Sequence, residues 1–370
     1  MRRLEHRVHR SRLLDSLDWP TLAATGALIA IGMFSIASAT AGNWQAGIWR
    51  SQLVFLGIAV VAATVIVLID YRVWAEISLA LHGVVILLLI VVLFFGHTVG
   101  GNRSWLVLGS LRLGQPSELA KLTTCLVLAV YLARRVRGTL GLRQLIEMGI
   151  LAGAPVALIA IQPDMGTALT FAPIVLAALI IGGVRWKWIG LALLVAMLLV
   201  PVAWPELKDY QKERILTVFD PGRDPSGVGY QSRQSKIAIG SGGITGKGLF
   251  KGTQNQLNYL PARHTDFVMA VFAEEFGFAG VLAILGLFYY LFRRGVAAAR
   301  SAQDRLGTYI CLLIGAWLAG QMVINVGVVL GRLPTIGVPL PFVSYGGSAL
   351  IAALCGVGLV VNVRSRRFVN

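Results

Sequence analysis

The sequence has few charged residues and very few cysteines. Charged side chains make up 14% of the 370 residues, hydrophobic ones make up 56%, and the mean hydropathy is +0.74. A soluble globular domain has about 25% charged residues, so this composition excludes that class and indicates an integral membrane protein. The three cysteines all fall within apolar stretches, so Cys125, Cys311 and Cys355 are expected to be buried apolar side chains and not a disulfide framework.

Long apolar stretches recur along the whole chain. A helix needs about 20 apolar residues to cross a hydrocarbon core about 30 Å thick. The stretches do not alternate in polarity, which disfavours barrel strands. We therefore predict an all-α integral membrane protein with about ten transmembrane helices, forming one polytopic domain over residues 1–370. The helices are expected near 20–38, 51–69, 75–94, 117–133, 145–161, 166–182, 186–203, 266–292, 307–330 and 342–363.

Basic residues lie mostly on one side of these predicted helices. Arginines cluster at both ends of the chain and in every second short connection, whereas the other short connections hold only Arg50, Arg103, Arg112 and Arg332. By the positive-inside rule, both termini are predicted to be cytoplasmic. The first apolar stretch is predicted to stay as an uncleaved helix, although Ala37-Ser38-Ala39 resembles a signal-peptidase site. This orientation puts the long polar connection 204–265, between helices seven and eight, on the extracytoplasmic side.

The connection 204–265 ends where an apolar run begins, at Asp266. A carboxylate at this boundary can meet a polar headgroup and still be partly desolvated. Partial desolvation raises the pKa of a carboxylate toward the working pH, which favours general-base catalysis. Asp266 is therefore the candidate catalytic base.

A glycine-rich stretch lies within the same connection, between Lys236 and Gly248. Its glycines can bring backbone amides close to a phosphate, or the stretch can simply be a flexible loop. It is not a nucleotide P-loop, because that motif requires glycine at 241 and Ser or Thr at 248, where the chain has Ser241 and Gly248. The candidate substrate contacts here are Arg233, Lys236, Ser241 and Gly242.

The fourth predicted helix opens with an acid and a base on one face. Glu118 and Lys121 are three residues apart, the spacing of neighbours on a helix. A lone lysine inside the membrane costs about 2.5 to 3.5 kcal/mol, so we expect the two side chains to pair toward the bundle interior. The pair can contact substrate or be purely structural, and Glu118 can also simply favour the helix start.

Three more residues at or within the membrane are candidate substrate contacts. Asp164, in the short turn 162–167, can cap the next helix or join Lys121 in one cavity. Trp105 can be an interfacial anchor or a substrate contact. Glu275 lies inside an apolar run, where acids are usually functional or paired, and Gln321 with Asn325 could be its partners.

The last outer connection is rich in proline and glycine. Between Gly331 and Pro341 these residues predict a rigid, irregular, re-entrant segment. Irregular backbone at membrane depth is tolerated only where protein or water satisfies it, so this segment is expected to form a cavity wall, followed by the candidate Ser344.

Five motifs in order resemble one known family. They are PSELAK at 116–121, QPDMGT at 162–167, YLPARHTDF at 259–267, AEEFG at 273–277 and PFVSYGGS at 341–348. They resemble the SEDS (shape, elongation, division, sporulation) family of bacterial peptidoglycan polymerases, and the resemblance covers nearly the whole chain. Residues 236–248 and 252–254 are most similar to the elongation (RodA) branch, rather than the division (FtsW) branch.

The resemblance implies a glycosyltransferase that polymerises lipid II on the outer face of the bacterial cytoplasmic (inner) membrane, releasing undecaprenyl diphosphate. It also implies a class B penicillin-binding protein as transpeptidase partner, and no nucleic acid. Asp266 matches the essential aspartate of the family, and Glu118, Lys121 and Asp164 match residues of its cavity.

This chemistry needs a base for the 4-hydroxyl of the acceptor sugar and cations for the departing diphosphate. The candidate cations are Lys121, Arg233, Lys236 and Arg263, and His264 and Thr265 flank the base. Because one carboxylate is singled out and not a close pair, we expect inversion at the anomeric carbon without a glycosyl-enzyme intermediate. A divalent cation could assist, although the sequence offers no evident ligand cluster.

Two other functions fit some of these features. Polar residues within membrane helices also suit a lipid transporter or flippase. The notable acids cluster toward the outer face and no inverted repeat is evident, which favours catalysis. The third possibility is a scaffold that only positions the transpeptidase.

Overall fold

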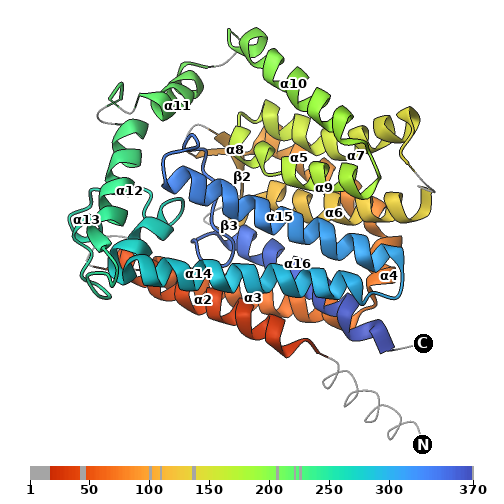
Figure 1. Cartoon of the computed structure of the whole chain (residues 1–370), viewed down its shortest axis with the longest axis horizontal. Helices are drawn as coiled ribbons and strands as arrows, with labels where there is room; N and C mark the ends of the chain where they lie inside the picture. The colour runs from red at the N-terminus through yellow and green to blue at the C-terminus, as the bar shows by residue number, and fades with distance from the viewer. Residues whose placement is uncertain are drawn as a thin grey trace, which may run out of the picture.

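The structure is a computed structural model that describes residues 17–41, 47–99, 102–108, 111–135, 139–205, 208–220, 222–224 and 227–368 (Figure 1). Helices occupy all of the predicted apolar stretches. They are α2 (Trp19–Thr40), α3 (Ile48–Leu68), α4 (Tyr71–Glu76) with α5 (Ser78–Phe95), α6 (Pro116–Arg135), α7 (Leu142–Ile161), α8 (Met165–Leu169) with α9 (Ala172–Ile181), α10 (Trp186–Ala203), α14 (Val268–Arg300), α15 (Arg305–Val329) and α16 (Gly347–Ser365). Within the described residues, eight of these are long and apolar enough to cross a membrane. A multi-pass helical protein is confirmed, and the number of ten spans stays a prediction.

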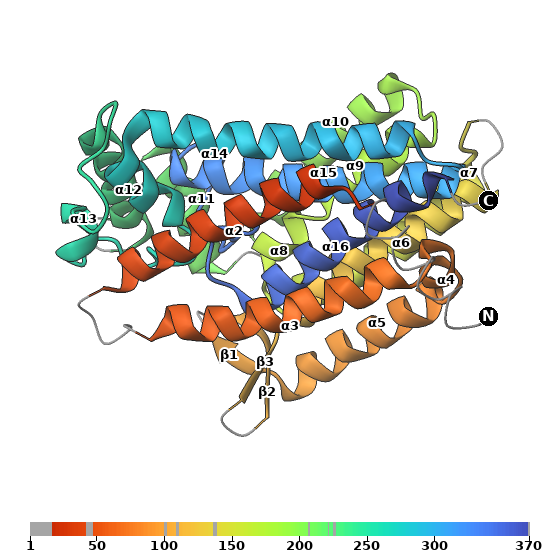
Figure 2. The same cartoon turned by 90° about the horizontal axis from the view of Figure 1, so that it is seen from below.

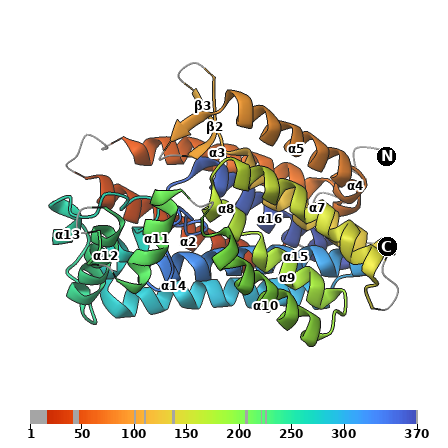
Figure 3. The same cartoon turned by 90° about the horizontal axis from the view of Figure 1, so that it is seen from above.

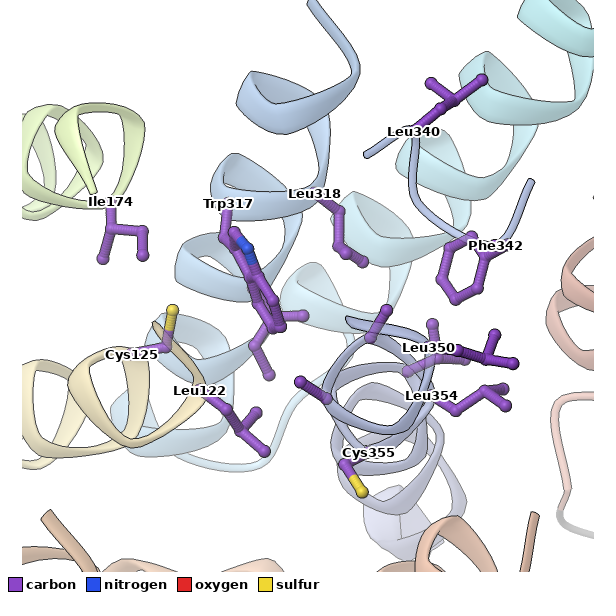
Figure 4. Close-up of a cluster of buried hydrophobic side chains, with 14 of the residues drawn as sticks. Leu122, Cys125, Ile174, Trp317, Leu318, Leu340, Phe342, Leu350, Leu354 and Cys355 are labelled. Carbon is purple, nitrogen blue, oxygen red and sulfur yellow. The ribbon is translucent and has the colours of Figure 1, made fainter. Parts of the chain in front are cut away.

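Helix α16 lies in the centre of the bundle and packs against α3, α6, α14 and α15. Figure 4 shows buried side chains of α6, α9, α15 and α16 converging around Trp317. Small residues allow the close approach, since an added Cβ on Gly356 would lie 3.2 Å from Ile314. In lipid, packing of this kind replaces the hydrophobic effect as the force between helices.

The long polar connection is largely helical. It contains α11 (Asp209–Phe219), α12 (Val228–Gly242) and α13 (Thr253–Gln256), which gather at one end of the bundle (Figures 2 and 3). The expected glycine-rich loop after Lys236 is therefore helical as far as Gly242. The backbone amides in that part are used within the helix, so they cannot cradle a phosphate.

A small antiparallel sheet interrupts the helical architecture between α5 and α6. Strand β2 (Asn102–Leu108) pairs with β1 (His97–Val99) on one side and with β3 (Leu111–Gly114) on the other. The sequence predicted only a polar loop here. The strands are short, and β2 projects from the side of the bundle that carries α3 and α5 (Figure 2).

The end of the bundle opposite α11 to α13 is held by ion pairs. Asp18, just before α2, is 4% exposed and contacts Arg294 of α14 and Arg364 of α16, the latter at 3.3 Å. Two cations on one buried carboxylate tie three helices together.

Helix α14 is broken at Gly277, which has φ 66°. The segment 243–248 fills the break: Lys247 N donates to Glu274 O at 3.0 Å, and Phe278 N donates to Gly243 O at 2.9 Å. The backbone groups that the break frees are thus paired, as a membrane-embedded helix requires. The polar connection is thereby joined to the helix that follows Asp266.

Replacing Gly277 with alanine is expected to destabilise the protein. At φ 66° and ψ −166° the backbone is in a region open essentially to glycine alone, which costs another residue about 1 to 3 kcal/mol, and the new Cβ would lie 2.4 Å from Gly246 N. The melting temperature in detergent should fall. Gly286→Ala, in the same helix with no atom within 4 Å of its added Cβ, is the control and should melt at or above the wild-type temperature. Equal melting temperatures for the two variants would contradict this account of the break.

Candidate active site

A polar cavity of about 550 Å³ lies where α6, α8 and α11 meet the segments that precede α14 and α16. Five predicted site residues line it: Glu118, Asp164, His264, Thr265 and Asp266. They come from three separate motifs of the sequence, so the fold brings together what the motifs suggested.

Asp266 is held by its backbone in the last turn before α14. Its carbonyl oxygen accepts a hydrogen bond from Asn325 Nδ2 at 3.0 Å, and the carbonyl of Thr265 accepts one from Ser344 Oγ at 2.6 Å. Ser344 does not line the cavity itself but fixes the residue beside the candidate base. These two contacts leave the carboxylate of Asp266 free to face the cavity.

The electrostatic environment suits a base. The side chain of Asp266 is half-buried, and burial raises its pKa to about 6, while the Thr265 hydroxyl and the Arg214 charge lower it. Neighbouring His264 has its pKa lowered by burial and by Arg263, so its imidazole is neutral near pH 7. Asp266 is consequently a carboxylate at neutral pH with a basicity close to the working range.

The predicted pair between Glu118 and Lys121 is confirmed. Lys121 Nζ lies 2.8 Å from Glu118 Oε1, and both side chains are at most 5% exposed. The same ammonium donates to Gln321 Oε1 at 3.0 Å and lies 5.5 Å from the centre of the Trp317 ring. The other oxygen, Glu118 Oε2, has no hydrogen-bond partner among the described residues. Lys121 therefore sits behind Glu118 and does not line the cavity.

Asp164 has both of the roles that its sequence allowed. It caps α8 by accepting from Thr167 N at 3.2 Å and from Thr167 Oγ1 at 2.9 Å. It also lines the cavity, where Gln115 Nε2 donates to it at 2.5 Å. Burial raises the pKa of Asp164, and the nearby charge of Glu118 raises it further.

The re-entrant segment forms a cavity wall, as predicted. Residues 331–346 contain no helix, and two of their carbonyls accept hydrogen bonds from side chains of α15. Gln321 Nε2 donates to Pro339 O at 2.9 Å, and Asn325 Nδ2 donates to Val338 O at 2.8 Å. The lining residues of this wall are Thr335, Ile336, Gly337 and Pro339.

The candidate contacts on α12 do not reach the cavity. Ser241 Oγ donates to the backbone of its own helix, and an added Cβ on Gly242 would lie 2.1 Å from Ala273 O, so the helix end packs directly on α14. Arg233 and Lys236 also lie on α12 and are absent from the lining of the cavity. None of the four lines this cavity, and their contact with substrate stays a prediction.

Arg263 and Glu275 are likewise engaged elsewhere. Arg263 is 5% exposed, and its Nη1 donates to Asn255 O at 3.1 Å and to Asn258 Oδ1 at 2.5 Å. Glu275 accepts from Ser38 Oγ of α2, so its predicted partners on α15 were wrong. Arg263 thus links residues within the polar connection, Glu275 contacts α2, and neither side chain lines the cavity.

Glu274, next to Glu275 in α14, fastens the polar connection to that helix. It is fully buried and accepts from Lys247 Nζ at 2.6 Å and from Gln254 N at 3.1 Å. The AEEFG motif is therefore a structural clamp for the connection.

Several lining residues were missed by the sequence analysis: Gln115, Arg214, Gln231, Tyr345 and Ser348. Gln115 directly precedes one motif, and Tyr345 and Ser348 lie within another, so their position could have suggested them. Nothing around Arg214 offered such a signal. Trp105 lies in β2, opposite His97, and its side chain falls outside the described part of the structure.

A larger cavity of about 660 Å³ lies between the starts of α7 and α10. Its walls are mostly apolar, with Arg185 as the charged residue, and no described carboxylate lines it. It therefore has no candidate base. Across the described ranges, no group of three or more His, Cys, Asp or Glu side chains is arranged to hold a metal ion.

Comparisons with known proteins all give the same family. Residues 15–368 match the family model described as FtsW/RodA/SpoVE, cell cycle protein. The chain is similar to the peptidoglycan glycosyltransferase MrdB of Escherichia coli K12, with 39% identity over 329 residues, 89% of this chain and 88% of that protein. It is also similar to the probable peptidoglycan glycosyltransferase FtsW of Trichlorobacter lovleyi, with 37% identity over 363 residues, 95% and 93% of the two chains.

Solved structures agree with this fold. A chain in "Structural coordination of polymerization and crosslinking by a peptidoglycan synthase complex" superposes with a TM-score of 0.82 at 35% identity, covering 96% of this chain and 99% of that one. The crystal structure of the rod shape determining protein RodA of Thermus thermophilus gives a TM-score of 0.72 at 31% identity, covering 96% and 98%.

Proposed function

Because this chain belongs to the FtsW/RodA/SpoVE family of cell cycle proteins, the SEDS family, we propose that it is a peptidoglycan glycosyltransferase that polymerises lipid II during cell elongation. The observation that carries the proposal is Asp266, a carboxylate of raised pKa that faces a polar cavity of about 550 Å³. The direct test is to supply lipid II to the purified protein and to separate the products by chain length. Lipid movement without polymer would favour a transporter, and partner activation without turnover would favour a scaffold.

Asp266 acts as the general base. As the 4-hydroxyl oxygen of the acceptor sugar attacks the anomeric carbon of the donor, its proton passes to the carboxylate. The bond from the anomeric carbon to the diphosphate oxygen breaks, its electron pair stays with the departing undecaprenyl diphosphate, and Asp266 later releases the proton to water. One base and a direct displacement give inversion at the anomeric carbon.

The Glu118 end of the cavity suits a sugar. Glu118 Oε2 lacks a partner among the described residues, so it can accept a hydrogen bond from a sugar hydroxyl. Lys121 is paired with Glu118 Oε1, and Asp164 with Gln115 adds further hydrogen-bonding groups beside Glu118. Lys121 thus supports substrate binding from behind Glu118 and has no direct contact with the diphosphate.

The cavity would face the outside of the bacterial cytoplasmic membrane. The helices α11 to α13 gather at the end opposite the Asp18, Arg294 and Arg364 cluster, which lies near the start of α2 and the end of α16 (Figure 2). By the positive-inside rule, the end of the bundle that holds this cluster, together with both termini, faces the cytoplasm. A class B penicillin-binding protein is the proposed partner, in line with the structural relative in a synthase complex that polymerises and crosslinks.

The rate of polymerisation should depend on pH through Asp266. A base must be deprotonated to act, and its pKa is raised to about 6, so activity is retained above that pH and lost as the pH falls through it. At pH 5 the initial rate should be about one tenth of the plateau value. Initial rates with lipid II well below KM between pH 5 and 8 report the free protein and test this, and a flat profile would contradict the assignment of the base.

A further inference from the structure

The cavity contains acids but hardly any cations. Glu118, Asp164 and Asp266 all line it, and among the lining residues in the described part of the chain Arg214 is the only lysine or arginine. Lys121, the predicted ligand for the diphosphate, is 1% exposed and already paired. A diphosphate entering such a site needs a positive group that faces it directly.

Arg214 is placed to meet this need. It lies on α11, is half-buried, and is close enough to Asp266 for its charge to act on that carboxylate. Its guanidinium lies 5.6 Å from the centre of the Tyr210 ring on the same helix, a contact that orients the group. Within the described residues it forms no ion pair with a carboxylate inside 4.0 Å, so its charge is not already neutralised.

We propose that Arg214 binds the diphosphate of the lipid-linked donor and stabilises the charge that develops on it when the glycosidic bond forms. The proposal rests on the glycosyltransferase function proposed above and deepens it by naming the group that receives the leaving diphosphate. A guanidinium presents two parallel N–H donors that match phosphate oxygens, which a lysine cannot do. The cation thus comes from a helix of the polar connection, while the base comes from the turn before α14.

The cavity has acidic and amide groups on one wall and a cation on another. Glu118 Oε2, Gln115 and Asp164 form a wall at the starts of α6 and α8, and Arg214 enters from α11. A donor whose sugar hydroxyls meet the acidic wall and whose diphosphate meets Arg214 is held at both ends of the bond that breaks. Positioning of this kind is a major part of the rate enhancement of glycosyl and phosphoryl transfer enzymes.

The test compares how a polyprenyl diphosphate and a polyprenyl monophosphate of equal chain length bind to the full-length protein. Wild type should bind the diphosphate more tightly, and Arg214→Ala should reduce that preference roughly 10- to 100-fold, the scale of one charged hydrogen-bonding group. Arg214→Lys should retain part of it. Lys212→Ala is the matched control, because Lys212 lies on the same helix, donates to Pro205 O at 3.3 Å and does not line the cavity.

The outcomes separate this proposal from the one before it. An unchanged preference in Arg214→Ala, or no preference in wild type, would overturn the role of Arg214. So would a preference that disappears with a metal chelator and is the same in wild type and Arg214→Ala, because a divalent cation would then be the ligand. Binding requires no turnover, so the result stands whether or not Asp266→Asn abolishes polymerisation, which tests the function itself.

Discussion

Asparagine in place of Asp266 is expected to lower glycan polymerisation by about 10²- to 10⁴-fold, the usual contribution of a general base. The amide has almost the same shape as the carboxylate but cannot accept the proton of the acceptor hydroxyl. The backbone contact that holds the residue, from Asn325 to Asp266 O, does not involve the side chain and should survive. Initial rates with purified lipid II in detergent or liposomes measure the loss.

Two controls make the result interpretable. Asp209→Asn removes an exposed carboxylate at the start of α11 and should leave the rate unchanged. The melting temperature of Asp266→Asn should equal or exceed that of wild type, because a half-buried carboxylate of raised pKa is less costly to fold once its charge is removed. Near wild-type polymerisation by a folded Asp266→Asn would exclude this residue as the base.

Much of the fold could be predicted from the sequence because lipid imposes a simple rule. Every spanning backbone must satisfy its own hydrogen bonds, so continuous apolar stretches become helices with little freedom of interpretation. Each predicted stretch contains a helix, and the pair α8 with α9 nearly coincides with the single predicted span 166–182, whereas α4 begins before the predicted span 75–94. The sheet between α5 and α6 lies in a polar connection, where that rule does not apply.

The predicted residues that pair or line the cavity as expected depend on short sequence distances. Glu118 and Lys121 are neighbours on one helix turn whatever else the chain does, and Asp266 is fixed by the boundary between a polar and an apolar segment. The proline- and glycine-rich segment 331–341 was recognisable because its composition cannot form a helix. The ion pair, the position of Asp266 and the irregular segment could all be predicted because each depends only on residues close together in the sequence.

Most differences between the predicted and observed site concern the long connection and the start of α14, whose conformation depends on distant contacts. Arg263 and Glu275 looked like ligands because buried charges are usually functional, yet Arg263 binds Asn255 within the connection and Glu275 binds Ser38 of α2. Gly242 looked like part of a phosphate loop, but it allows α12 to touch α14. Arg214 reaches the cavity only because α11 folds over it, which no local pattern indicates.

Methionine in place of Lys121 is expected to destabilise the protein by about 3 to 5 kcal/mol, the cost of leaving one member of a buried ion pair without its partner. Glu118 would remain 4% exposed with neither oxygen paired to a cation. The Gln321 oxygen would also lose one of its two donors, Lys121 and Trp317. Melting temperature in detergent, or unfolding in a denaturing detergent, measures the loss of stability.

The double variant Glu118→Gln with Lys121→Met separates structure from function. Removing both charges removes the unpaired buried carboxylate, so most of the lost stability should return. Polymerisation should stay low, because the amide offers a sugar hydroxyl a weaker acceptor than the carboxylate it replaces. Recovery of activity together with stability would make the pair purely structural. A Lys121→Met single variant as stable as wild type would instead contradict the expected contribution of the Glu118–Lys121 ion pair to stability.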